Sequence, residues 1–265
     1  MIDPFLKWAG GKRWLVRRFD TLFPKVFTRY IEPFLGSGSV FFHLNPGKAI
    51  LADNNSELIN AYRCVKATPL LIHRRLIQYQ ARHSAAFYYK IRKAAPPAAL
   101  DRAVRFIYLN RTCFNGLYRV NLDGLFNVPV GSKTKVQFPT RYLSDIAMAM
   151  KHASIRVADF ETSLAEAGAG DFAYIDPPYT VMHNNNNFIK YNASLFSWKD
   201  QIRLSVAVRR AARRGALIMV SNADHESVRE LYGGFGTHHS VERSSRLAAD
   251  AQHRERATEL VVVNY

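Results

Sequence analysis

Short apolar runs that end on a turn or an acid alternate along the chain with stretches of helical spacing. The apolar runs predict strands at 29–34, 48–53, 153–160, 171–179, 214–222 and 259–265. Apolar residues with helical spacing occur at 14–23, 39–44 and 55–66. A strand, a glycine turn, a helix and a second strand ending on an acid are typical of doubly wound sheets. We therefore predict an α/β fold around a mixed, mainly parallel seven-stranded sheet.

A long central region departs from this alternation. Apolar residues at helical spacing predict basic helices over 70–94 and 100–112. We interpret residues 59–149 as an insertion into an α/β domain that is formed by residues 1–58 and 150–265.

Turn chemistry marks the end of the inserted region. Within 113–131, the dipeptides Asn115-Gly116 and Asp123-Gly124 both favour turns. The apolar residues between them predict a short strand, so this segment is expected to form a protruding hairpin.

The charge of the chain is segregated. Its 265 residues include 37 lysines and arginines against 21 aspartates and glutamates, a net charge of +16. Residues 59–149 hold 15 of the basic side chains and only three acids. This segregation favours a polyanion partner, most simply nucleic acid. An anionic membrane, or a basic surface without a function, is the alternative.

Other features of the composition limit the class of protein. No run approaches the ~18 apolar residues of a membrane span, and the N-terminus lacks the apolar core of a signal peptide. Cys64 and Cys113 provide neither a disulfide framework nor a metal site. We expect a cytoplasmic protein that needs no metal.

A glycine turn and an acid form the first candidate site. Gly36 and Gly38 follow the first strand, but Phe41 stands where a dinucleotide fingerprint has its third glycine. Asp53 ends the second strand, where an acid can accept hydrogen bonds from a ribose diol or can cap the next helix. This pattern disfavours a nicotinamide enzyme and still fits a nucleoside cofactor.

The second candidate site is the turn Asp176-Pro177-Pro178-Tyr179. An exocyclic amine of a base is a poor nucleophile, and two acceptors on its hydrogens would localise the lone pair. The Asp176 carboxylate and a proline-fixed backbone carbonyl can be these acceptors. Tyr179 can then stack on a base that has been pulled from its helix. The alternative is an ordinary turn that ends a strand.

Five blocks carry a resemblance to a known family. In order along the chain they are FLKWAGGK at 5–12, EPFLGSGS at 32–39, LADNNSEL at 51–58, LNRTCFNGLYRVNLDGLFNVPVG at 109–131 and IDPPY at 175–179. The chain resembles the Dam-type DNA adenine N6-methyltransferases over nearly its whole length. The resemblance implies a Rossmann-like methyltransferase fold, S-adenosylmethionine as methyl donor and a target-recognition role for residues 59–149.

The resemblance also implies roles for individual residues. Asp176, Pro177, Pro178 and Tyr179 fall on the catalytic motif. The places that contact the cofactor are Trp8, Lys12, Phe34, Gly36, Gly38, Asp53, Asp159, Phe160 and Asp176. Asp159 would read the adenine amino group of the cofactor, and Phe160 would stack on its ring or lie in the core.

The predicted DNA contacts lie at the N-terminus and in the hairpin. Lys7 and Arg119 match base-contacting places of the family, and the fork of Arg119 suits guanine O6 and N7. Asn115 and Tyr118 are candidate neighbours, for a hydrogen bond and for stacking or wedging. Asp123 departs from the basic residue that is usual in the family. The family's usual target is GATC, which Lys7 and Arg119 favour.

Several alternatives stay open. Transfer to RNA adenine or to cytosine N4 uses similar chemistry, and a DNA-binding regulator could keep the fold without turnover. We expect a monomer that associates with the nucleoid, with or without a cognate restriction nuclease. The tract Asn184–Asn187 is interpreted as a lid. Near the C-terminus, Arg243, Arg246, Arg254 and Arg256 form either a solvated loop or a second phosphate-contacting edge.

Overall fold

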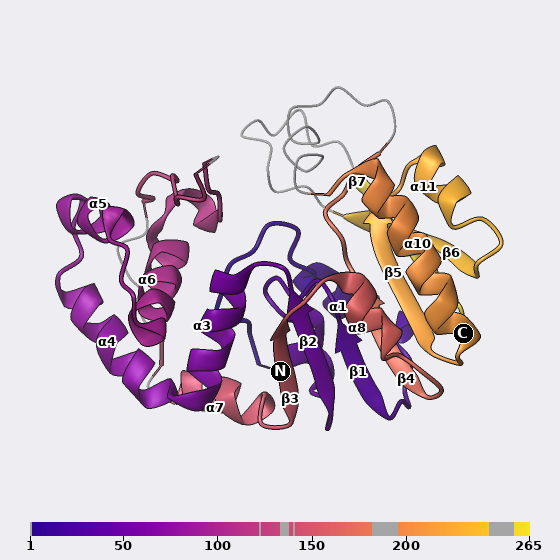
Figure 1. The fold of residues 1–265 in the computed structure, drawn as a ribbon, viewed down its shortest axis with the longest axis horizontal. Helices are drawn as coiled ribbons and strands as arrows, with labels where there is room; N and C mark the ends of the chain where they lie inside the picture. The colour runs from indigo at the N-terminus through magenta and orange to yellow at the C-terminus, as the bar shows by residue number, and fades with distance from the viewer. Residues whose placement is uncertain (1, 122, 133–137, 140, 182–195, 244–256) are drawn as a thin grey trace. The chain divides into compact units, whose positions relative to one another are not determined.

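The computed structural model describes two compact units of the chain (Figure 1). Residues 2–121, 123–132, 138–139, 141–181, 196–243 and 257–265 are described. The first unit comprises residues 1–16, 35–47 and 53–157, and the second comprises 17–34, 48–52 and 158–265. The predicted lid at Asn184–Asn187 and the arginines at 246, 254 and 256 lie outside the described residues. The assignment of residues 59–149 as an inserted target-recognition region stays a prediction.

Seven strands form one sheet in the order β3-β2-β1-β4-β5-β7-β6. The strands are β1 (Arg29–Glu32), β2 (Ala49–Asp53), β3 (Ala153–Val157), β4 (Asp171–Ile175), β5 (Leu217–Ala223), β6 (Thr237–Arg243) and β7 (Ala257–Val263). Strand β1 pairs in parallel with β2 and β4, and β4 pairs in parallel with β5. Strand β7 runs antiparallel to both β5 and β6. The predicted mixed, mainly parallel seven-stranded α/β fold is confirmed.

The apolar pattern did not predict β6. Its sequence, THHSVER, contains a single aliphatic residue, Val241, which is buried. The strand lies at the end of the sheet and pairs with β7 alone. Backbone pairing, rather than apolar alternation, therefore defines this edge strand.

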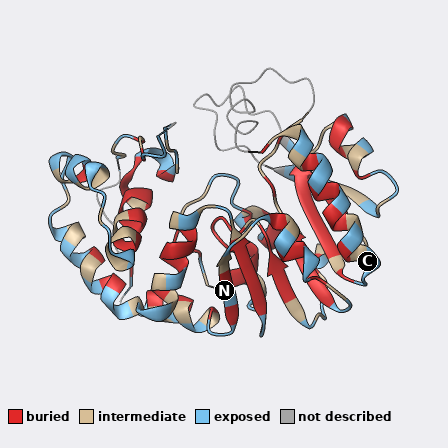
Figure 2. Cartoon of the chain, viewed as in Figure 1, coloured by how far each residue is buried: buried red, intermediate tan, exposed pale blue. Residues whose placement is uncertain are grey.

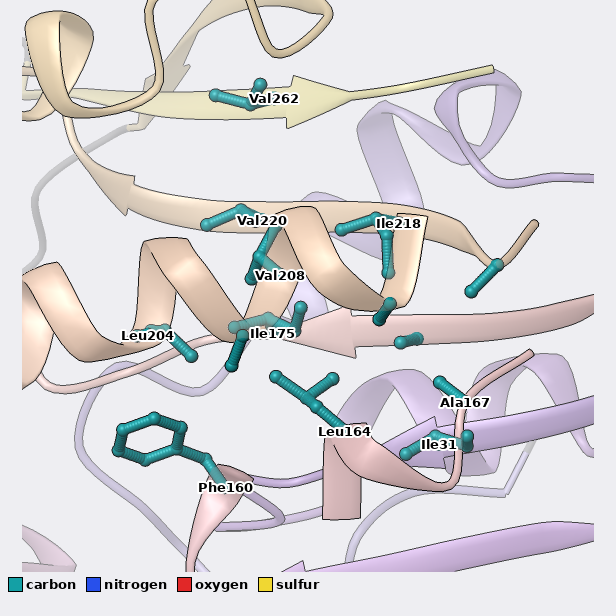
Figure 3. Packing of buried hydrophobic residues seen from close by; sticks show 14 of the residues in the cluster. Ile31, Phe160, Leu164, Ala167, Ile175, Leu204, Val208, Ile218, Val220 and Val262 are labelled. Atoms are coloured by element: carbon teal, nitrogen blue, oxygen red, sulfur yellow. The ribbon is translucent and has the colours of Figure 1, made fainter. Parts of the chain in front are cut away.

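Helices cover one of the two apolar faces of the second unit's strands (Figure 3). The helical elements of this unit are η1 (Asp20–Leu22), α8 (Phe160–Ala165), α10 (Trp198–Arg213) and α11 (Glu226–Leu231). Leu164 of α8 and Val208 of α10 pack in the same cluster as Ile31, Ile175 and Val220 of the strands. A run such as residues 171–175, buried at every position, is the pattern expected of a central parallel strand.

The first unit is mainly helical. Its helical elements are α2 (Ser39–Leu44), α3 (Ser56–Ala67), α4 (Pro69–Ala81), α5 (Ala85–Lys93), α6 (Ala99–Thr112), η2 (Phe114–Gly116) and α7 (Tyr142–Ala149), and α1 (Arg13–Arg18) begins in it. Helices α3 and α6 each have one side formed by buried residues (Figure 2). None of the helices among the described residues has the length and apolar character to cross a membrane.

Two local predictions in this unit were wrong. The helical stretch 70–94 is broken into α4 and α5, because the Ser84 side chain accepts from the backbone N of Phe87 and starts a new helix. In the hairpin, the described residues contain no extended strand between the two turns. Isolated bridges join Cys113 to Val130 and Val120 to Phe126 instead.

Candidate active site

The glycine turn holds the carboxylate of Asp53. The backbone N of Gly36 donates to Asp53 Oδ2 over 3.2 Å, and the backbone N of Asn55 donates to Oδ1 over 3.0 Å. Burial raises the pKa of Asp53 to about 6, although these backbone hydrogen bonds act in the opposite direction. Asn55 caps α3 by accepting from Leu58 N, so Asp53 is not the cap of this helix.

Trp8 lies against the glycine turn. Gly36 has a φ of 46°, and a Cβ there would lie 2.8 Å from Cδ1 of Trp8, so glycine is required on both grounds. The other neighbours of the indole are Tyr118, stacked with ring centroids 5.4 Å apart, and Phe106 at 6.4 Å. A predicted cofactor residue and a predicted DNA residue, Trp8 and Tyr118, are therefore in contact.

The N-terminal segment is attached to the base of the hairpin. Asn110 accepts from Lys7 N over 2.9 Å and donates from Nδ2 to Lys7 O over 2.7 Å. A Cβ at Gly116 would lie 2.3 Å from Cδ of Lys7, so the lysine stem passes directly over this glycine. Lys12 is buried, and its Nζ donates to Gly10 O over 2.9 Å.

The hairpin presents Arg119 in a fixed orientation. Arg119 Nε donates to Asn127 Oδ1 over 2.8 Å, and Asn127 N donates back to Arg119 O over 3.2 Å. These bonds fix one edge of the guanidinium and leave its two terminal nitrogens as a fork. Asp123 accepts from Asn121 Nδ2 over 3.2 Å, so this acid has a partner within the turn itself.

The hairpin also exposes apolar side chains. Phe114 is 52% exposed, Leu117 39% and Leu125 61%. The neighbouring Asn115 has a φ of 52° and is exposed, whereas Tyr118 also packs on Phe126. Phe114 and Leu117 are therefore more accessible than Tyr118 for apolar contacts. Among the aromatic and apolar residues of this segment, the sequence had suggested only Tyr118 for stacking or wedging.

In the second unit, the turn Asp176 to Tyr179 follows the buried strand β4 directly. Tyr179 donates its hydroxyl hydrogen to Glu259 Oε2 over 2.7 Å, and its oxygen lies 3.1 Å from Ser221 Oγ. The Pro178 carbonyl accepts from Gln201 Nε2 over 3.3 Å. Both prolines restrict the backbone, and these contacts fix the end of the motif.

Phe160 lies in an aromatic group within the same unit. Its ring is 5.6 Å from that of Phe34 and 5.7 Å from that of Phe196, and the Arg203 guanidinium lies 4.9 Å from its centroid. The Asp159 carboxylate caps α8 by accepting from Glu161 N over 2.8 Å. Phe160 thus has the position of a core residue, which was one of its two interpretations.

Much of the basic excess is engaged within the protein. Arg63, Lys66, Arg92 and Arg105 donate to backbone carbonyls, while Arg75 and Arg102 pair with Asp101 and Glu57. The exposed cations Lys90 and Lys93 lie on α5. This helix contacts the hairpin through Tyr88, whose hydroxyl donates to Val128 O over 2.9 Å.

Sequence reasoning missed several polar residues that hold the predicted ones. They are Asn110, Asn127, Gln201, Ser221, Asn222 and Glu259. An acid that directly precedes the apolar run of a strand, as Glu259 does in ATELVVV, is a signal that could have identified one of them. The others have no distinguishing local pattern.

Comparison with known proteins identifies the family. Residues 8–245 match the family described as D12 class N6 adenine-specific DNA methyltransferase. The chain therefore belongs to this family and is an adenine-specific DNA methyltransferase.

Named relatives agree with this class. A "Type II methyltransferase M1.LlaDCHI" of Lactococcus lactis is 36% identical, over 100% of this chain and 96% of its own length. A "Type II methyltransferase M.MjaIII" of Methanocaldococcus jannaschii is 33% identical, over 100% and 99%. The "DNA adenine methylase" of Escherichia coli is 36% identical, over 86% and 83%. The predicted kinship with Dam-type enzymes is confirmed.

Proposed function

We propose that the protein transfers a methyl group from S-adenosylmethionine to N6 of an adenine extruded from duplex DNA, within the sequence GATC. The observation that carries this proposal is the turn after β4. It places a carboxylate, a proline carbonyl and a half-buried tyrosine ring in sequence, with its last two residues held by buried side chains. These are the groups that activation of an exocyclic amine requires.

The residues of the first unit fit the nucleoside part of this cofactor. Asp53 offers carboxylate oxygens beside a tight glycine turn, which suits the two donors of a ribose diol. S-adenosylmethionine has no phosphate, so the absence of the third glycine at Phe41 does not count against it. Trp8 and Lys12 of the same unit would contribute from the N-terminal segment.

S-adenosylmethionine, when bound, supplies an electrophilic methyl group on a sulfonium cation. Asp176 would accept one hydrogen of the adenine amine and so localise its lone pair. Gln201 already donates to the Pro178 carbonyl, which leaves the Pro177 carbonyl as the better candidate for the second acceptor. Tyr179 would stack on the extruded base. Transfer would form the N–C bond as the S–C bond of the sulfonium breaks, leaving the thioether S-adenosylhomocysteine. The proton that the amine then loses would pass to Asp176.

The hairpin would read the target sequence. The fork of Arg119 suits guanine O6 and N7, and Lys7 would reach a base from the segment tied to Asn110. The exposed Phe114 and Leu117 would contact bases or fill the space of the extruded adenine. We assign GATC because of Lys7 and Arg119. Asp123 stands where the family usually has a basic residue, so we do not assign a phosphate contact to this position.

The removal of one carboxylate tests the catalytic assignment. Asp176→Ala is expected to lower the rate of methyl transfer to duplex DNA by at least about 10²-fold, because the acceptor of the amine hydrogen is lost. DNA binding should remain measurable in a mobility-shift assay. Glu230→Ala removes an exposed acid of α11 and serves as the matched control. Near-normal turnover of Asp176→Ala would exclude the proposed role.

Analysis of the methylated product distinguishes DNA adenine from the alternative substrates, RNA adenine and DNA cytosine. Duplex DNA and RNA of one sequence are incubated with the protein, digested to nucleosides and analysed by mass spectrometry. The proposal predicts N6-methyladenine in DNA alone. N6-methyladenine in RNA, or N4-methylcytosine in DNA, would identify the rival activities. Gel filtration tests the expected monomeric state. Co-purification from a native host tests whether a restriction nuclease binds the protein.

A further inference from the structure

Four buried polar side chains surround the turn from Asp176 to Tyr179. They are Gln201 on α10, Ser221 and Asn222 on β5, and Glu259 on β7, with exposed fractions of 0%, 0%, 1% and 3%. All four come from elements outside the motif. Buried polar groups of this kind destabilise a protein unless they are hydrogen-bonded, so their partners indicate why they are present.

The two residues of β5 support the turn from opposite faces of one strand. Successive strand residues point to opposite faces, so Ser221 and Asn222 diverge. Ser221 Oγ lies 3.1 Å from the Tyr179 hydroxyl. On the other face, Asn222 Nδ2 donates to Gln201 Oε1 over 3.0 Å, and Gln201 Nε2 donates to Pro178 O. The end of the motif is thus held from both faces of the sheet.

Glu259 holds the tip of the tyrosine ring. Its register partner on β5 is Ala223, which lies on the same face as Ser221, and its Oε2 accepts from the Tyr179 hydroxyl over 2.7 Å. Burial, with the charges of Asp176 and Glu259, raises the pKa of Tyr179 well above its ordinary value, so the hydroxyl stays a donor. Two contacts at the ring tip restrict χ1 while the half-buried ring keeps an accessible part.

We propose that Glu259 and Gln201 are positioning residues for methyl transfer: Glu259, with Ser221, orients the ring of Tyr179, and Gln201, with Asn222, fixes the Pro178 carbonyl. This inference rests on the proposed roles of Asp176 and Tyr179 in binding the adenine. A fixed ring and a fixed turn hold the amine in line with the methyl group. Errors of about 1 Å in such placement lower rates by about 10²-fold.

Glu259 is tested by single-turnover methylation at saturating cofactor and duplex. Glu259→Leu removes the acceptor, and we expect its rate to fall about 10- to 100-fold, with dissociation constants for DNA and cofactor within about 2-fold of wild type. Glu259→Gln keeps an acceptor oxygen and should retain a rate within about 3-fold of wild type. Tyr179→Phe breaks the same contact from the other side and covers the case that Glu259→Leu does not fold.

A double-mutant cycle separates positioning from a general structural role. Once the hydroxyl is absent, loss of Glu259 should cost little more, so Tyr179→Phe/Glu259→Leu should be about as slow as either single variant. 2-Aminopurine at the target position should also lose its quenching by the ring in Tyr179→Phe and Glu259→Leu. Val261→Ala is the control, because Val261 is buried on the same strand and pairs with Ser221. It should lower the melting temperature and leave the rate unchanged.

Gln201 is tested in the same way. Gln201→Met keeps the length of the side chain and removes the donor to Pro178, so its rate should fall about 10-fold without a change in affinity. Wild-type rates in Glu259→Leu, Tyr179→Phe and Gln201→Met would overturn the inference while leaving the proposed function intact. Rate losses matched by equal losses of affinity would also overturn it. A wild-type protein without adenine methylation, or an unimpaired Asp176→Ala, would instead overturn the proposed function and the inference with it.

Discussion

At the scale of single residues, Asp53 shows how burial opposes the ionisation of a carboxylate. Its carboxylate is buried beside Gly36, and the pKa of about 6 means that the folded protein without ligand holds a proton over roughly pH 4 to 6. The unfolded chain releases that proton near its ordinary pKa of 3.8. This residue therefore favours the folded state at acid pH, and that contribution is lost as pH rises through about 6.

Cofactor binding should depend on pH in the opposite direction. A ribose diol donates hydrogen bonds, so it favours the ionised carboxylate of Asp53. Affinity for S-adenosylhomocysteine, measured by calorimetry, should be constant above pH 7 and about tenfold weaker at pH 5. Asp53→Asn should bind weakly at every pH and show no such dependence. An unchanged affinity of the wild type from pH 7.5 to 5 would contradict the contact.

At the scale of elements, the hairpin and α5 form one supported surface. Tyr88 and Arg92 of α5 donate to the Val128 carbonyl, and Asn127 orients Arg119 on the opposing segment. The Arg119 side chain is therefore held in place although the described residues of the hairpin form only two isolated bridges. The proposed guanine contact of Arg119 depends on this order, because a mobile arginine would lose the bidentate geometry that distinguishes guanine.

Substitution of Arg119 should change specificity. Arg119→Ala is expected to weaken binding to GATC by about 1–3 kcal/mol and to reduce discrimination at one guanine, since the bidentate contact is lost. Asn127→Ala keeps the arginine and should cost less, because only its orientation is loosened. Competition binding with single-base variants of the site measures both effects. Equal losses on all sequences would show that Arg119 contacts phosphate rather than a base.

The two exposed lysines of α5 should contribute to DNA affinity without regard to sequence. Lys90→Gln with Lys93→Gln is expected to weaken binding to all duplex sequences and to reduce the slope of log affinity against log salt by about 2. Lys25→Gln with Lys48→Gln removes two exposed lysines of the second unit and should leave the slope near that of wild type. Equal slopes for the two double variants would contradict a role for α5.

At the scale of the whole molecule, the sequence predicted the order of strands and helices better than it predicted the residues that hold the candidate site in place. Central strands such as β4 contain a continuous apolar run, here residues 172–175, because they are buried on both faces, and the sequence shows this pattern. The sequence does not predict strand β6, because the pairing of this strand with β7 depends on backbone hydrogen bonds and not on an apolar pattern. Gln201 and Glu259 illustrate the same limit, since their partners Pro178 and Tyr179 lie 23 and 80 residues away.

The basic charge of residues 59–149 also has more than one role. The sequence pattern assigned the excess to a polyanion partner, yet Arg63, Lys66 and Arg105 donate to backbone carbonyls of their own unit. Arginine and lysine are well suited to satisfy such carbonyls. Net charge alone therefore overstates the number of phosphate contacts.

The central claim is most directly tested by mapping methylated bases in living cells. The protein is expressed in a bacterial host without adenine methylation, and the genome is sequenced by a long-read method that detects N6-methyladenine. We predict N6-methyladenine at nearly all GATC sites, and none above background in cells that express Asp176→Ala. Marks at another sequence would contradict the assigned specificity, and the absence of adenine marks with soluble wild-type protein would contradict the proposed function itself.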